Sequence, residues 1–252
     1  MLKQFVQTHL NHRLHKGVLC YLSLGTFLVM LYAGTTSYFE TIGSILSNKT
    51  YLCVFVFPAF LMFFLYYDND LSCNHFIVTR FTSRKKFLRF RWKSMILHTL
   101  VLFVELLLVI TILNAILYSL HFRIQLYELV LPLKKISILN IVYALSRVLK
   151  VVGGILFLQA LLFVLKSFTK MESISVMLMI GIILLIYMQT TIVHLSLFSF
   201  LLPGTHIYQY CSDVSFSLWM VLDLIYFGVV ILLCYLIHFL ILQRQSLLGE
   251  KI

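Results

Sequence analysis

Few ionisable side chains interrupt the long apolar stretches of this sequence, and any intramembrane chemistry would have to use them. Glu105 falls near the middle of one stretch, and Asp223 lies about two turns into the last one. His98, His194 and His238 sit nearer the ends of their stretches. Because an ionisable group at membrane depth is costly, it usually serves a function or pairs with another group.

These side chains do not form the pattern of a catalytic set. The sequence has no HExxH zinc motif, no paired intramembrane glutamates and no Walker A loop. His9, His12 and His15 recur at every third position, but this spacing drifts across about a third of a helix circumference. The five cysteines show neither metal-binding nor redox spacing. We therefore expect no catalytic residue, no metal and no cofactor in this chain, and no ATP hydrolysis by it.

Glu105 permits two interpretations. It could be a structural carboxylate, either neutral or paired with Arg147 or Lys150 on a neighbouring helix. Alternatively, it could be a substrate or proton site in a translocation path. For Asp223 the sequence favours a structural or interfacial role, because this residue can reach the outer polar zone.

The composition indicates a membrane protein. Of the 252 residues, 61% are hydrophobic and only 12% are charged, whereas soluble domains carry about 25% charged residues. The net charge of +11 is explained by the excess of lysine and arginine in cytoplasmic loops. We therefore expect membrane lipid, and no nucleic acid, as a partner.

Six stretches are long and apolar enough to span a membrane, so the predicted fold is an all-α, polytopic membrane domain occupying residues 1–252. Pro58 is expected to kink the second span, and the fourth span takes in Arg147 and Lys150, whose long side chains would extend to the interface. The six predicted spans are Gly17–Thr36, Tyr51–Tyr67, Met95–Leu117, Ala144–Val164, Ser173–Phe200 and Phe216–Leu242.

The distribution of basic residues predicts the orientation. If both termini are cytoplasmic, 14 of the 20 lysines and arginines fall on the inner side. Residues 1–16 place apolar side chains on one broad helical face, so we expect an interfacial helix and no cleavable signal peptide. We expect residues 201–215, with the pair Pro203-Gly204, to turn at the outer face.

A basic segment, residues 68–93, separates the second and third spans. It has an acidic and polar start, then a short stretch carrying Phe76, Ile77 and Phe81, and then Ser83, which can cap a following helix. The basic charge alone would be explained by topology and by contact with anionic lipid. The break at Thr82-Ser83 favours a helical hairpin that projects into the cytosol and offers its apolar residues to a partner.

This arrangement resembles the permeases of type-2 ATP-binding-cassette exporters. The run Val78 to Phe87 is similar to a sequence of small Gram-positive permeases that export, or give immunity to, lantibiotics and other amphipathic peptides. The resemblance implies an elbow helix at Ser83–Lys93 and an outer gate at Pro203 and Gly204. It also implies an ATPase-docking site, formed by Phe76, Ile77, Arg80, Phe81 and Arg84.

The expected function is that of a non-catalytic permease subunit in a bacterial plasma membrane, which exports an amphipathic peptide or lipid-like substrate. Its partners would be a second permease chain, identical or homologous, and an ATPase subunit that binds ATP and magnesium. Phe57 and Phe60, on one face of the second span, would line the translocation path together with Glu105. Lipid-facing packing explains these phenylalanines equally well. The alternative function is a non-transporting immunity or sensor protein that binds a peptide.

Overall fold

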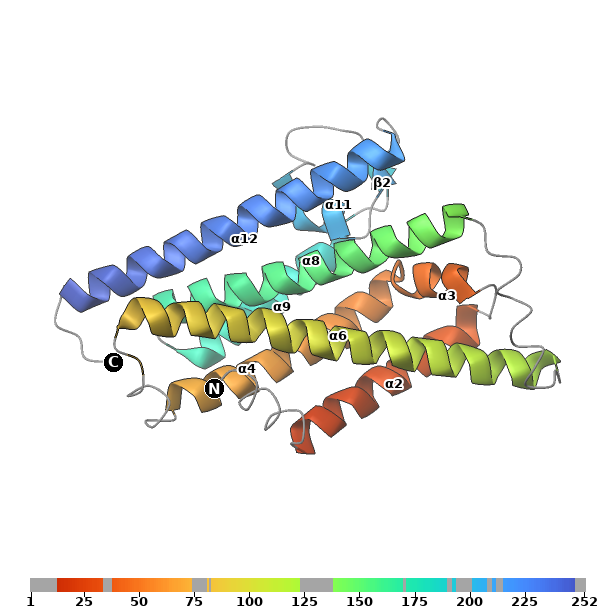
Figure 1. Cartoon of the computed structure of the whole chain (residues 1–252), viewed down its shortest axis with the longest axis horizontal. Coiled ribbons are helices and arrows are strands. Elements are labelled where there is room, and N and C mark those ends of the chain that lie inside the picture. The colour runs from red at the N-terminus through yellow and green to blue at the C-terminus, as the bar shows by residue number, and fades with distance from the viewer. Residues whose placement is uncertain are drawn as a thin grey trace.

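The computed structural model describes residues 13–33, 38–73, 81, 83–122, 138–169, 171–189, 192–193, 201–207, 210–211 and 215–247. Most of these residues are helical, and two short strands pair with each other (Figure 1). The elements are α2 (Arg13–Ala33), α3 (Tyr38–Ile45), the π-helix η1 (Tyr51–Val56), α4 (Phe57–Cys73), α6 (Arg84–Phe122), α8 (Ile138–Thr169), α9 (Glu172–Met188), β1 (Ile192–Val193), α11 (Pro203–Ile207), β2 (Tyr210–Cys211) and α12 (Phe216–Leu247).

Five helical segments are long and apolar enough to cross a membrane, which agrees with a membrane-embedded protein. They are Arg13–Tyr32, Tyr51–Asp70, Lys85–Leu117, Asn140–Thr169 and Phe216–Ile241. Six spans are not confirmed. The expected fifth span, Ser173–Phe200, contains α9, which has 17 residues and ends where the backbone becomes extended at Gln189.

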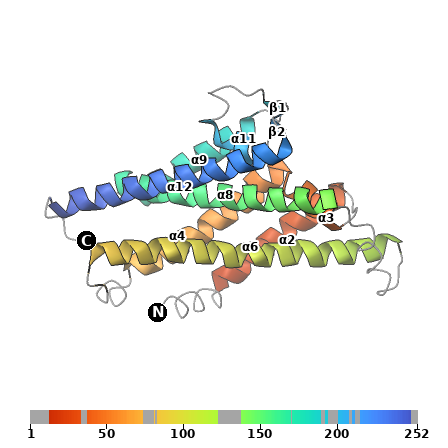
Figure 2. The ribbon, with the colours of Figure 1, turned by 45° about the horizontal axis from the view of Figure 1, so that its top comes forward.

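Helix α8 is central in the bundle. It contacts α3, α4, α6, α9, α11 and α12, and it runs alongside α12 in both views (Figures 1 and 2). Gly153 and Gly154 make two of these contacts possible, since an added Cβ would lie 2.5 Å from Phe227 of α12 and 2.9 Å from Ile207 of α11, respectively. Small residues of this kind let helix backbones approach closely in membranes.

One local expectation from the sequence holds. Ser83 precedes α6, and its side-chain hydroxyl accepts a hydrogen bond from the backbone N–H of Lys86 at 3.4 Å. The helix then continues without a break into the third apolar segment. Near Pro58 the chain changes from the π-helix η1 to α4, and the kink expected at this proline stays a prediction.

The amino-terminal helix differs from expectation. Residues 1–12 of the predicted interfacial helix lie outside the described residues, and the last four residues of that prediction form the first turn of α2. This helix begins beside the middle of α6 (Figures 1 and 2). His15, expected on a polar surface, is buried there.

Candidate functional site

A fully buried carboxylate, Asp68, joins three helices at the end of the bundle where residues 74–83 connect α4 to α6. Arg91 of α6 donates hydrogen bonds to both of its oxygens, at 2.6 Å and 2.7 Å. Lys166 of α8 donates to the same carboxylate at 3.0 Å. The sequence analysis had assigned Asp68 to the polar start of a projecting hairpin. That assignment is wrong, because Asp68 and Arg91 are internal partners.

Asn69 extends this network to α9. Its side-chain amide donates to both carboxylate oxygens of Glu172, at 2.8 Å and 3.0 Å, and its carbonyl oxygen accepts a hydrogen bond from Lys166 at 2.9 Å. We call Asp68, Asn69, Arg91, Lys166 and Glu172 the Asp68 cluster. The cluster ties both helices that flank residues 74–83 to the turn between α8 and α9. Two acidic and two basic side chains balance its charge.

A second buried ion network lies toward the other end of α8. Lys150 Nζ is 2.7 Å from one oxygen of Asp223, and His206 Nδ1 is 2.8 Å from the other. The His206 ring stacks on Tyr226, with ring centroids 3.8 Å apart, and on Trp219 at 5.6 Å. We call Lys150, His206 and Asp223 the Asp223 cluster. It fixes the short helix α11 against α8 and α12.

The two clusters are separated along α8 by a distance comparable to a membrane. Lys150 and Lys166 are 16 residues apart in one continuous helix, which corresponds to about 24 Å at a rise of 1.5 Å per residue. The hydrocarbon core of a bilayer is about 30 Å thick. Each cluster therefore lies near one end of the apolar part of the bundle.

A third contact involves Glu105. His15 Nε2 of α2 lies 3.0 Å from Glu105 Oε2 of α6, and the ring of Phe63 packs against His15 with centroids 5.3 Å apart. Glu105 therefore contacts His15, whereas the structural interpretation from the sequence paired it with Arg147 or Lys150. The Glu105 side chain remains 30% exposed, although its Oε2 atom is buried.

The basic residues of α8 correct another expectation. Arg147 and Lys150 were expected to extend to the interface, but both are buried. Lys150 binds Asp223 and lies over the Trp219 ring, and the Arg147 guanidinium lies 5.2 Å from the Tyr143 ring centroid. A partner inside the bundle thus replaces the expected contact with the interface.

The remaining predicted site residues fall into three groups. Phe57 and Phe60 are buried in the core, so within one chain they line no open path. Phe81 packs on Phe87 and Phe90 of α6, with ring centroids 5.5 Å and 5.1 Å apart. The third group is the rest of the predicted docking site, which lies outside the described residues: Phe76, Ile77, Arg80 and the side chain of Arg84.

The predicted outer gate lies in α11. Pro203 is the first residue of this helix, a position that proline favours, and Gly204 is buried within it.

Between α3 and η1, Lys49 donates a hydrogen bond of 2.6 Å to the backbone carbonyl of Gln189, at the end of α9. Burial lowers the pKa of the Lys49 ammonium, and nearby Cys53 offsets part of this effect.

Sequence reasoning missed several members of these clusters. His206 was passed over because it lies outside the apolar spans, and Arg91 and Lys166 were counted only as topology signals. The signal available was the presence of Asp68 and Asp223 beside apolar runs, since each needs a cationic partner when buried.

The described residues hold no group of three metal-ligating side chains. No protein-family model, curated protein or solved structure matches this chain.

Proposed function

We propose that this chain is the permease subunit of an ATP-binding-cassette exporter and that a separate ATPase subunit drives it. The observation that carries the proposal is the Asp68 cluster. Through Asp68, Arg91 and Lys166, the helices on both sides of residues 74–83 are held to α8. Asn69 links α9 to the same cluster through Glu172. A partner that moves this hairpin would therefore move the ends of α4, α6, α8 and α9 together.

In this proposal the basic hairpin is cytoplasmic, with both termini on the same side, in a bacterial plasma membrane. Phe76 and Ile77 enter a groove on the ATPase, and Arg80 and Arg84 surround them. Phe81 takes part in docking from the base of the hairpin, where its half-buried ring packs on Phe87 and Phe90 of α6. Two permease chains and two ATPase subunits complete the transporter, and the substrate is an amphipathic peptide or a lipid-like molecule.

The Asp223 cluster supports a gate at the opposite end. A short helix between α9 and α12 is held against the bundle by the contact of His206 with Asp223, and α8 accommodates it at Gly154. Breaking the contact of His206 with Asp223 takes a partner away from a buried carboxylate, which is unfavourable unless the carboxylate finds another. Displacement of α11 therefore requires a coordinated rearrangement, which is suited to a gate that opens only when the hairpin end has moved.

The first test is purification of the full chain from its native membrane in a mild detergent, with identification of the proteins that accompany it. An ATP-binding-cassette ATPase at comparable abundance is expected. The double variant Phe76→Asp/Ile77→Asp should lose this subunit, whereas Arg89→Gln, which removes one exposed charge from α6, should retain it. A folded chain without an ATPase, or an unaffected complex in the double variant, would contradict the proposal.

The second test concerns coupling. Asp68→Asn is assayed on the folded fraction recovered by size-exclusion chromatography, because the substitution also lowers stability. That fraction should keep the ATPase bound, since the docking residues are unchanged, but should export less per ATP hydrolysed. Export and ATP hydrolysis are measured together in proteoliposomes. Equal coupling in the variant and the wild-type protein would show that the Asp68 cluster does not transmit movement.

A further inference from the structure

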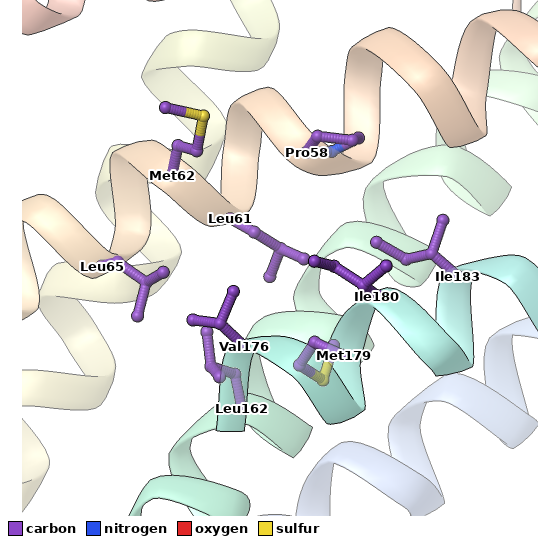
Figure 3. Close-up of a pocket in the computed structure, with 9 residues that line it drawn as sticks. All are labelled: Pro58, Leu61, Met62, Leu65, Leu162, Val176, Met179, Ile180 and Ile183. Carbon is purple, nitrogen blue, oxygen red and sulfur yellow. The ribbon is translucent and has the colours of Figure 1, made fainter. Parts of the chain in front are cut away.

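A slot lined only by apolar side chains opens between α4 and α9, and Leu162 of α8 forms its floor (Figure 3). Its volume is about 270 Å³. At its rim, Met62 of α4 and Ile180 of α9 are 58% and 54% exposed. The slot therefore opens toward the side of the bundle.

Both ends of the slot are closed along the bundle. At one end η1 contacts α9. Pro58, which lies two residues after the end of η1, lines the slot at this end. At the other end Asn69 bridges to Glu172 through two hydrogen bonds. An occupant must therefore enter from the side, and in a bundle of membrane-spanning helices that side faces the bilayer.

The polar groups near the slot follow the same spacing on all three helices. Asn69, Lys166 and Glu172 each lie four residues, or about 6 Å along the helix, from a residue that lines the slot. The three pairs are Leu65 with Asn69, Leu162 with Lys166, and Val176 with Glu172. A polar layer thus borders the apolar slot at the hairpin end, as headgroups border acyl chains in a bilayer.

We propose that this slot holds one acyl chain of a membrane phospholipid, with the headgroup beside Asn69, Lys166 and Glu172. The slot is smaller than the roughly 300–1,000 Å³ of a usual small-molecule site, so its size suits part of one acyl chain. A helix of a partner protein is about 10 Å wide. If such a helix occupied the slot, it would therefore also cover the exposed carboxylate of Glu172. The proposal requires only that the chain lies in a membrane and does not depend on the transport function.

The test uses the full chain reconstituted into vesicles of phosphatidylcholine and phosphatidylglycerol. The vesicles contain phosphatidylcholine with a photoreactive diazirine in one acyl chain. After illumination, adducts are located by mass spectrometry of peptides. We expect them to concentrate on slot residues such as Leu61 and Ile180, at several-fold higher density than on the opposite face of α9, which carries Leu178 and Leu185.

Val176→Phe fills the slot and should lower the adducts at Leu61 several-fold, whereas Leu185→Phe adds the same ring on the opposite face of α9 and should not. If Val176→Phe does not fold, Ile180→Trp at the rim replaces it with the same expected loss. Equal adduct density on both faces of α9 would overturn the proposal. So would an unchanged yield in the filled variant, or cross-links between two copies of the chain at the slot without lipid adducts.

Discussion

Arg91 donates two hydrogen bonds to Asp68 across the segment that links α4 to α6, so the two ends of the basic hairpin are fixed to each other. Asp68 is fully buried, and Lys166 adds a third hydrogen bond from α8. A buried ion pair contributes little net stability compared with apolar packing, but removing one partner leaves an uncompensated buried charge. The cluster is therefore better suited to specifying how three helices meet than to adding stability.

Asp68→Asn should destabilise the protein strongly. The substitution leaves the charges of Arg91 and Lys166 without their buried partner, and such a loss costs about 3–5 kcal/mol. Unfolding in detergent, followed as Tm by circular dichroism, measures the effect. Asp70→Asn is the matched control, because Asp70 is an exposed carboxylate two residues farther along the same helix, and it should change stability by no more than about 1 kcal/mol. Equal Tm values for the two variants would contradict the structure of the cluster.

The contact of Lys150 with Asp223 should behave as a coupled pair. Lys150→Met and Asp223→Leu each leave one charged partner buried, so each should lower stability by about 3–5 kcal/mol. The double variant removes both charges and should be less destabilised than the sum of the single effects. A double-mutant cycle on Tm and unfolding free energy measures this difference. Strict additivity would mean that the two side chains do not interact.

Gly153→Ala tests the close approach of α8 and α12. An added Cβ would lie 2.5 Å from the Phe227 ring, which is itself buried, and overpacking of this kind costs about 1–3 kcal/mol. Gly181→Ala in α9 is the control, since nothing lies within 4 Å of the added Cβ. Alanine there should stabilise the helix by roughly 0.5–1 kcal/mol. A Tm that rises in both variants would mean that α8 and α12 are farther apart.

The sequence predicted the apolar helices better than their partners. Length and hydrophobicity identify α2, α4, α6, α8 and α12, because a helix that crosses a membrane needs about 20 apolar residues. The helices extend beyond the apolar spans, most of all α6, which begins at Arg84, whereas the predicted span begins at Met95. The same criterion overextended the fifth span. Apolar character continues past Gln189, but the helix ends there with an extended backbone, so hydrophobicity alone did not locate the end of α9.

Ionic partners were predicted least well. The sequence indicates that buried Asp223 requires a cation, but Lys150 was considered a partner for Glu105 or an interfacial residue. The choice depends on which faces of α8 and α12 meet, and Gly153 decides this through its contact with Phe227. His15 shows the same limit, since its pairing with Glu105 arises from where α2 begins along α6.

Glu105→Gln should separate the two interpretations of this residue. Glutamine keeps the side-chain size and can still contact His15 at the position of Oε2, so Tm should change little. If Glu105 lines the translocation path, loss of its charge lowers export of the peptide substrate. Glu40→Gln is the control, because Glu40 is an exposed carboxylate that accepts a hydrogen bond from Asn140, and its export should match the wild-type protein.

The His15→Phe variant extends this test. Phenylalanine can pack against Phe63 in place of the histidine ring, but it removes the only nitrogen that the described residues place beside Glu105 Oε2. If the two residues act as one unit, His15→Phe combined with Glu105→Gln should lower export no further than Glu105→Gln alone. Export is measured in proteoliposomes with the partner ATPase. Unchanged export in Glu105→Gln would exclude the path role for this carboxylate.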